Sequence, residues 1–129
     1  MLALLVCACA SKAPSEKKMV NGKPYWYWTP SDGDLLGGVG EAGTHVSGTS
    51  AQRELAIQRA IESIARQKGV TVSNIQRVEQ YATSGGATNV QISGYSVHTV
   101  EGVVLSTKVR EVWQDPQTRK LIVWVTEAK

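Results

Sequence analysis

Cysteine is almost missing from this sequence of 129 residues. Its two cysteines, Cys7 and Cys9, both lie within residues 1–9. The rest of the chain therefore has no disulfide framework, no thiol nucleophile and no cysteine ligands for a metal ion.

A basic surface is also lacking once the first residues are set aside. The chain has 14 Lys and Arg against 11 Asp and Glu, a net charge of +3. Four of the lysines and one acid precede residue 30, which leaves ten charges of each sign in residues 30–129. Because a nucleic-acid groove needs a basic face on the folded domain, the sequence predicts no nucleic-acid partner.

A membrane-spanning run is absent at the N-terminus, where the apolar stretch is shorter than the roughly 20 residues that a bilayer requires. Such a stretch is typical of a signal-peptide core, although no Lys or Arg precedes it. Residues 6–9, VCAC, resemble the lipobox of bacterial lipoproteins. We therefore expect residues 1–8 to be a lipoprotein signal peptide truncated at its start, and Cys9 to carry the lipid. The alternative is a frayed apolar N-terminus.

Residues 9–30 are predicted to be a lipidated tether that ends in an aromatic segment. Residues 24–30, PYWYWTP, hold four of the eight aromatic residues. The two prolines predict an extended path and not a helix, so Trp26 and Trp28 would face the same way. They would either anchor the chain at the lipid head groups or cover the domain's own sheet.

The clearest period in the chain is that of a helix at residues 50–68. Its broad apolar side is formed by Ala56, Ile57, Ala60, Ile61, Ile64 and Ala65. Thr49 and Gln52 suggest a capping box, and Gly69 marks the end. Leu55 falls among the charged residues of the opposite side, where it would be free to contact another subunit.

Residues 38–43, GVGEAG, match the dinucleotide-binding pattern G-x-G-x-x-G. That pattern should open a helix directly, whereas THVSGT separates this stretch from residue 50. We therefore predict no cofactor here. The glycines instead indicate a strand that passes close beneath the helix. Further along, residues 74–100 fit either strands or a short second helix.

The C-terminal residues predict a β-hairpin, with strands at 103–114 and 121–127 joined by a turn at Pro116. Apolar residues occupy both faces of this hairpin, and one helix can cover only one face. Either the aromatic segment or a second subunit must cover Ile122 and Trp124. Together with Leu55, these two residues are the predicted contacts of a homo-oligomer.

Groups for catalysis are sparse. His45 and His98 have no partner at metal-ligand spacing, and Asp32 with Asp34 lacks the rest of a calcium loop. Glu111 interrupts an apolar strand and could be an ion-pair partner or reach solvent at a strand edge. The sequence therefore predicts no metal site, no cofactor and no enzyme.

Taken in order, these features resemble the LPP-twenty family of outer-membrane lipoproteins. The resemblance is carried by Cys9, Pro24 with Trp26, residues 38–42, the alanines at 56, 60 and 65 followed by Arg66, and Gly102-Val103 leading to Trp113 and Asp115. It implies an α+β fold at residues 31–129, dodecin-like, with one long helix on a small antiparallel sheet that ends in a β-hairpin.

The resemblance also implies a non-catalytic lipoprotein, anchored on the periplasmic face of the outer membrane, with a structural role in the cell envelope. Some members of the family belong to the flagellar base and are needed for motility, so basal-body proteins are expected partners. The alternative is an envelope domain that binds a small ligand or acts as an enzyme.

Overall fold

The computed structural model describes residues 19–84 and 87–128. The predicted signal peptide at residues 1–8, the lipid site Cys9 and the first half of the tether lie outside the described residues. In chain order the elements are β1 (Met19–Val20), β2 (Lys23–Pro24), α1 (Tyr25–Trp28), β3 (Gly37–Ala42), α2 (Thr49–Lys68), β4 (Val72–Ser84), β5 (Ala87–Thr99), β6 (Val104–Gln114) and β7 (Leu121–Glu127).

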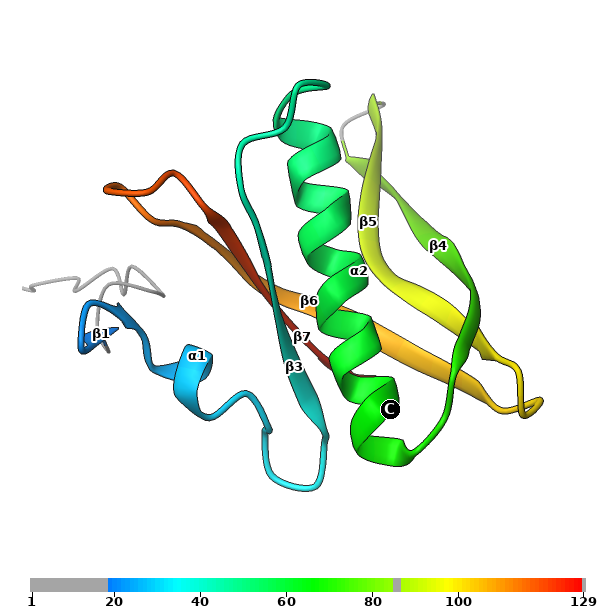
Figure 1. Cartoon of the computed structure of the whole chain (residues 1–129). Helices are drawn as coiled ribbons and strands as arrows, with labels where there is room; N and C mark the ends of the chain where they lie inside the picture. Colours follow the sequence, from blue (N-terminus) through cyan, green and yellow to red (C-terminus); the bar gives the residue numbers. More distant parts are fainter. Residues whose placement is uncertain (1–18, 85–86, 129) are drawn as a thin grey trace, which may run out of the picture.

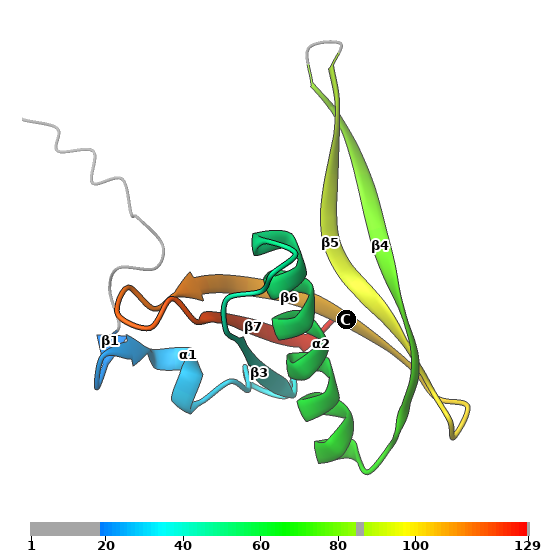
Figure 2. The ribbon, with the colours of Figure 1, turned by 45° about the horizontal axis from the view of Figure 1, so that its top comes forward.

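The fold is α+β, as predicted, with the long helix α2 lying across a five-stranded antiparallel sheet (Figure 1). The strand order is β3-β7-β6-β5-β4, so β3 and β4 are the two edges. β1 and β2 form a separate two-stranded sheet. The hairpin of β4 and β5 projects well beyond the rest of the sheet (Figure 2).

Helix α2 confirms the predicted helix, but not its predicted start. Gly48 is the N-cap and no side chain caps the first turn. The Gln52 side chain is instead buried, and its Nε2 donates to the carbonyls of Ala42 and Arg119, both at 3.0 Å. Gly69 ends the helix in the left-handed conformation, with φ of 70°, as predicted.

Strand β3 passes directly beneath α2, and its glycines allow this. A Cβ on Gly40 would lie 1.7 Å from the carbonyl oxygen of Ala56, and one on Gly38 would lie 2.3 Å from that of Ala60. Small residues on both elements thus bring the two backbones together. The predicted close approach of strand and helix is confirmed.

Residues 74–84 and 87–99 belong to strands β4 and β5, so the second short helix considered there is wrong. β4 and β5 pair along their whole described length. Ile75 pairs with Val97, and both pack against the core beneath α2. Contact with distant residues decides the conformation of a segment whose local pattern fits either state.

The C-terminal hairpin of β6 and β7 is confirmed, but a β-bulge changes which residues share a face. Val109 pairs with Val125, and the next paired residue on β6 is Glu111, so Arg110 is extra. The side-chain alternation therefore shifts by one. In a strand without a bulge Trp113 would share a face with Val109, but it lies on the opposite face.

The two faces of the sheet carry two separate clusters of buried apolar residues. The larger one lies beneath α2 and includes Ile57, Ile61, Ile64, Tyr95, Val97, Leu105, Leu121, Val123 and Val125. The smaller one lies on the other face and consists of Trp26, Ile122 and Trp124, with Tyr27, Val39 and Trp113 packed against it.

Candidate functional site

The second sheet face is covered by the aromatic segment, which folds as a helical turn. The predicted extended path is wrong, because Tyr25–Trp28 form α1 directly after Pro24. Proline is tolerated at a helix start, since its φ suits the helix and no amide is needed there. Trp26 is fully buried by this turn.

Trp26 closes the face through a stack and a hydrogen bond. Its ring lies parallel to Trp124, and its Nε1 donates to Glu111 Oε2 at 2.7 Å. Trp124 Nε1 in turn donates to the carbonyl of Pro30 at 2.6 Å. Buried indoles require such acceptors. Glu111 is half-buried on β6, an interior strand of the sheet, so it is not a residue at a strand edge.

This packing corrects the predicted oligomer contacts on the sheet. Ile122 is 1% exposed and Trp124 is 5% exposed within one chain. No second subunit is needed to cover them, because Trp26 does so. Leu55 is half-buried against the larger cluster, so it does not point wholly away from the core as expected.

Two cations lie beside the aromatic rings of this sheet face, one over the aromatic segment and one over Trp124 of β7. Lys23 Nζ lies 5.1 Å from the centre of the Tyr27 ring. Arg110 stands 4.9 Å from the Trp124 ring centre and pairs with Asp32 at 3.0 Å. The bulge that introduces Arg110 therefore also supplies a cation to the aromatic cluster.

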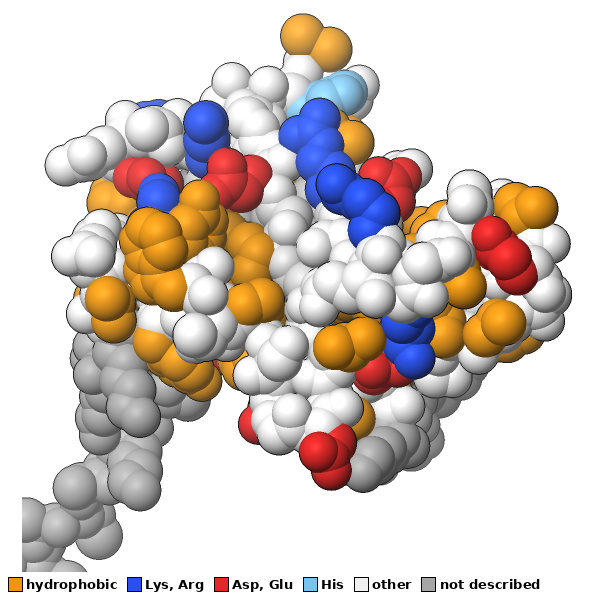
Figure 3. Space-filling model, turned by 60° about the horizontal axis from the view of Figure 1, so that its bottom comes forward, with side chains coloured by type: hydrophobic (Ala, Val, Ile, Leu, Met, Phe, Trp, Pro, Cys, Tyr) orange, Lys and Arg blue, Asp and Glu red, His pale blue; other side chains and the backbone are white. Residues whose placement is uncertain are grey.

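An exposed apolar patch remains on the outer side of this segment, and we call it the N-terminal patch. It consists of Met19, Val20, Tyr25 and Trp28, which are 40–49% exposed. Trp28 Nε1 donates to the Val20 carbonyl at 2.9 Å, which joins β1 to α1. Figure 3 shows hydrophobic side chains gathered over this end of the molecule. The two tryptophans that were expected to face the same way therefore differ: Trp26 covers the sheet, and only Trp28 reaches the surface.

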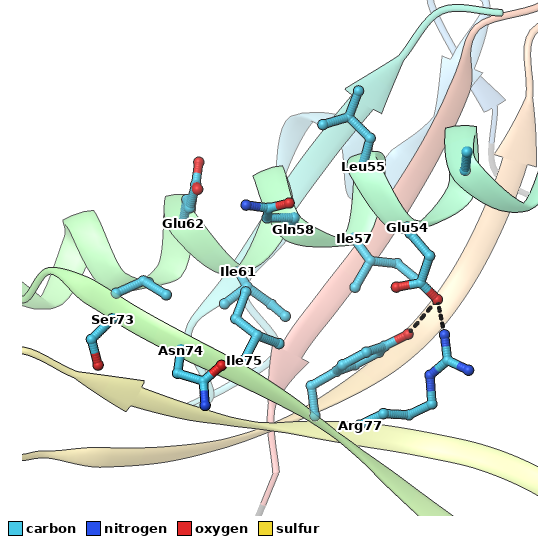
Figure 4. Close-up of a pocket in the computed structure, with 13 residues that line it drawn as sticks. Glu54, Leu55, Ile57, Gln58, Ile61, Glu62, Ser73, Asn74, Ile75 and Arg77 are labelled. Carbon is cyan, nitrogen blue, oxygen red and sulfur yellow. Dashed lines mark hydrogen bonds and ion pairs between the residues drawn. The ribbon is translucent and has the colours of Figure 1, made fainter. Parts of the chain in front are cut away.

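A second candidate site is a groove of about 740 Å³ between α2 and β4 (Figure 4). Its apolar lining comes from Leu55, Ile57, Ile61, Val72 and Ile75. The polar residues that line it include Gln58, Glu62, Ser73 and Asn74. The groove exists because α2 lies over β3 and β7 and leaves the β4 side of the sheet uncovered.

One end of the groove is closed by a charged cluster. Arg77 pairs with Glu54, and the Tyr95 hydroxyl donates to the same Glu54 oxygen at 3.3 Å. Burial raises the pKa of Tyr95, and the charge of Glu54 raises it further, while Arg77 opposes both. Glu54 also raises the pKa of Arg77. Each group neutralises or bonds another, so the cluster ties α2 to the β4–β5 hairpin.

The remaining predicted polar residues do not converge. His45 lies in the exposed loop before α2, where its Nδ1 accepts the amide of Ser47 at 3.0 Å, and His98 is on β5. Within residues 19–84 and 87–128 no group of three metal-ligating side chains occurs. Among the helices described, none combines the length and hydrophobicity needed to cross a bilayer.

Sequence reasoning missed the groove and the Glu54, Arg77 and Tyr95 cluster. Continuing the register of Ser84 with Ala87 would pair Arg77 with Gly94, and only the register shift between Val78 and Glu79 brings Arg77 opposite Tyr95. The position of Glu54 relative to them depends on how α2 crosses the sheet, for which no sequence signal exists. Comparisons with protein-family models, curated proteins and solved structures give no match to this chain.

Proposed function

We propose that this chain is a non-catalytic lipoprotein of the outer membrane with a structural role in the cell envelope. Cys9 carries the lipid, and the domain is held with its α1 end toward the bilayer. The observation that carries this proposal is the N-terminal patch, which lies on the first described elements, in the second half of the predicted tether.

The tether limits how far this patch can be from the membrane. Residues 10–18 span at most about 30 Å when fully extended. Trp28 and Tyr25 belong to the residue types that favour the head-group layer. Lys23, which lies over the Tyr27 ring, precedes them by two residues or more in the chain. The patch is therefore the part of the domain best suited to rest on the lipid surface.

The resemblance to the LPP-twenty family supports the structural role. A long helix on an antiparallel sheet is compatible with the dodecin-like domain of that family, and Ala10 after Cys9 is compatible with transport to the outer membrane. A place at the flagellar base and a need in motility follow from the same resemblance. The groove beside α2 favours a second candidate, an envelope domain that binds a small ligand.

Membrane attachment is tested by Cys9→Ala, expressed with a functional lipoprotein leader. The variant should leave the membrane fraction, and globomycin should leave the unchanged chain unprocessed. Quenching of tryptophan fluorescence by brominated lipids then tests the orientation. Trp28→Phe should remove most of the quenching, and Trp26→Phe, which changes a buried ring, should keep it.

The structural role is tested by deleting the gene and measuring motility and envelope integrity. Loss of either supports the proposal. The second candidate would be favoured by two results together. The deletion strain would assemble its envelope and flagella normally, and a small molecule would bind the groove of the unchanged chain but not that of Ile75→Glu. Unchanged membrane partitioning in Cys9→Ala would contradict the anchor.

A further inference from the structure

The two edge strands of the sheet, β3 and β4, differ in whether side chains of the same chain bond their backbone groups. At the β3 edge, side chains of α2 bond the strand's backbone carbonyls. Arg59 donates to the Glu41 carbonyl at 2.6 Å, and Gln67 Nε2 donates to the Gly37 carbonyl at 2.8 Å. Bonds of this kind occupy the groups that a foreign strand would need. This edge is protected by its own chain.

The β4 edge has no comparable cover in the described part of the chain. β4 pairs only with β5, and no side chain of another element bonds the backbone of residues 72–78. Val78 is 43% exposed on this strand. A long edge strand with unpaired amides and carbonyls is a template for another strand.

The sequence of β4 is complementary to itself when read in the antiparallel direction. Strand β4 runs from Val72 to Ser84, and Val78 is its centre. Four of the six pairs of positions equidistant from Val78 match in chemistry: Arg77 with Glu79, Gln76 with Gln80, Ile75 with Tyr81, and Ser73 with Thr83. The other two, Asn74 with Ala82 and Val72 with Ser84, do not match. Facing residues of opposite charge or shared apolar character stabilise an antiparallel pair.

We propose that β4 pairs with β4 of a second copy, around a twofold axis at Val78. The two sheets then join into one continuous antiparallel sheet. The axis places Arg77 of each copy opposite Glu79 of the other, so the interface contains two equivalent pairs of opposite charge. This interface is independent of the membrane anchor, and it assigns self-association to the sheet edge and not to the face of Ile122 and Trp124.

The same pairing accounts for the open groove. Ile75 and Arg77 line the groove and lie on the sheet face that α2 covers. Directly opposed residues of an antiparallel pair belong to the same face. In the proposed register, positions 79 and 81 of the second copy stand opposite Arg77 and Ile75. An apolar lining that is open in one chain is bordered by the added strand in the dimer.

The position of the axis is tested by cross-linking the full chain with Cys7→Ser and Cys9→Ser. Val78→Cys should be linked into a dimer by a short bis-maleimide. Val104→Cys, on β6 and 57% exposed, is the control and should stay single. Gln76→Cys should link to Gln80→Cys in a mixture faster than either variant links to itself. Equal rates for Val78→Cys and Val104→Cys would overturn the proposal.

The charge pairing is tested by sedimentation of Glu79→Arg. Two symmetric contacts become repulsive at once, so we expect about a tenfold rise in the dissociation constant of the dimer. Asp34→Arg makes the same change of charge in an exposed loop and should leave the constant unchanged. An unchanged chain that sediments as a monomer at about 100 µM, well above the micromolar range of specific association, would reject the interface.

Discussion

The indole rings of Trp26 and Trp124 lie nearly parallel, at 9° to each other, with their centres 5.8 Å apart. Ninety-eight positions separate them in the chain, yet the stack closes the face of the sheet that α2 does not cover. The aromatic segment is therefore part of the fold, and its contribution to the free energy of unfolding can be measured.

Replacing Trp26 by alanine should lower the free energy of unfolding by about 3–5 kcal/mol, because a large buried ring is removed and a cavity is left. Trp28→Ala is the matched control. Trp28 is 49% exposed, and its loss should lower that free energy by about 1 kcal/mol or less. Urea unfolding of both variants measures the difference, and equal losses would show that α1 does not seal the sheet.

Glu111 should matter as the acceptor for Trp26. Glu111→Ala leaves the buried Nε1 without a partner, so we expect the free energy of unfolding to fall by about 1–3 kcal/mol. Glu111→Gln keeps an acceptor oxygen on a side chain of the same length, so its free energy of unfolding should fall by less. The prediction fails if the glutamine variant is as unstable as the alanine variant.

A methyl group on Gly40 should separate β3 from α2. The added Cβ would meet the carbonyl oxygen and then the backbone nitrogen of the helix, neither of which can move alone. We expect Gly40→Ala to lower the free energy of unfolding by about 3 kcal/mol or more. Gly43→Ala, where a Cβ meets nothing within 4 Å, is the control and should be nearly neutral. Thermal unfolding of the pair gives the comparison.

Glu127 should make stability depend on pH. Partial burial raises the pKa of Glu127, but its bonds to Lys68 Nζ at 2.9 Å and to the Leu36 amide at 3.0 Å outweigh this, and the pKa lies below its ordinary value of 4.5. A lowered folded-state pKa adds stability that is present above pH 4.5 and is lost as the pH falls through the folded-state value.

Glu127→Gln should therefore differ from the unchanged chain most at neutral pH, by about 1–2 kcal/mol, and least in acid. Unfolding free energies at a series of pH values from neutral to about 3, below the carboxyl pKa range, measure this difference. A difference that stays constant over the whole series would show that the Glu127 charge plays no part.

The sequence by itself determined the elements whose local pattern has a single solution. Helix α2 follows from isoleucines and alanines at helical spacing, and Gly69 ends it because glycine adopts positive φ without strain. The strand at Gly38 and Gly40 and the C-terminal hairpin also follow from local composition. In each case the pattern of neighbouring residues is enough to predict the element.

Only the tertiary structure decided how these elements meet. Arg110 is the extra residue of a bulge, so Trp113 changed faces, and no local pattern marks that shift. Gln52 bonds the Arg119 carbonyl, 67 residues away, in place of the predicted cap. Trp26 covers the second sheet face because it stacks on Trp124, which belongs to a strand far away in the sequence. Strand register, the acceptor of a side-chain hydrogen bond and the partner of a stacked ring all depend on residues that are distant in the sequence. Those residues come together only when the chain folds.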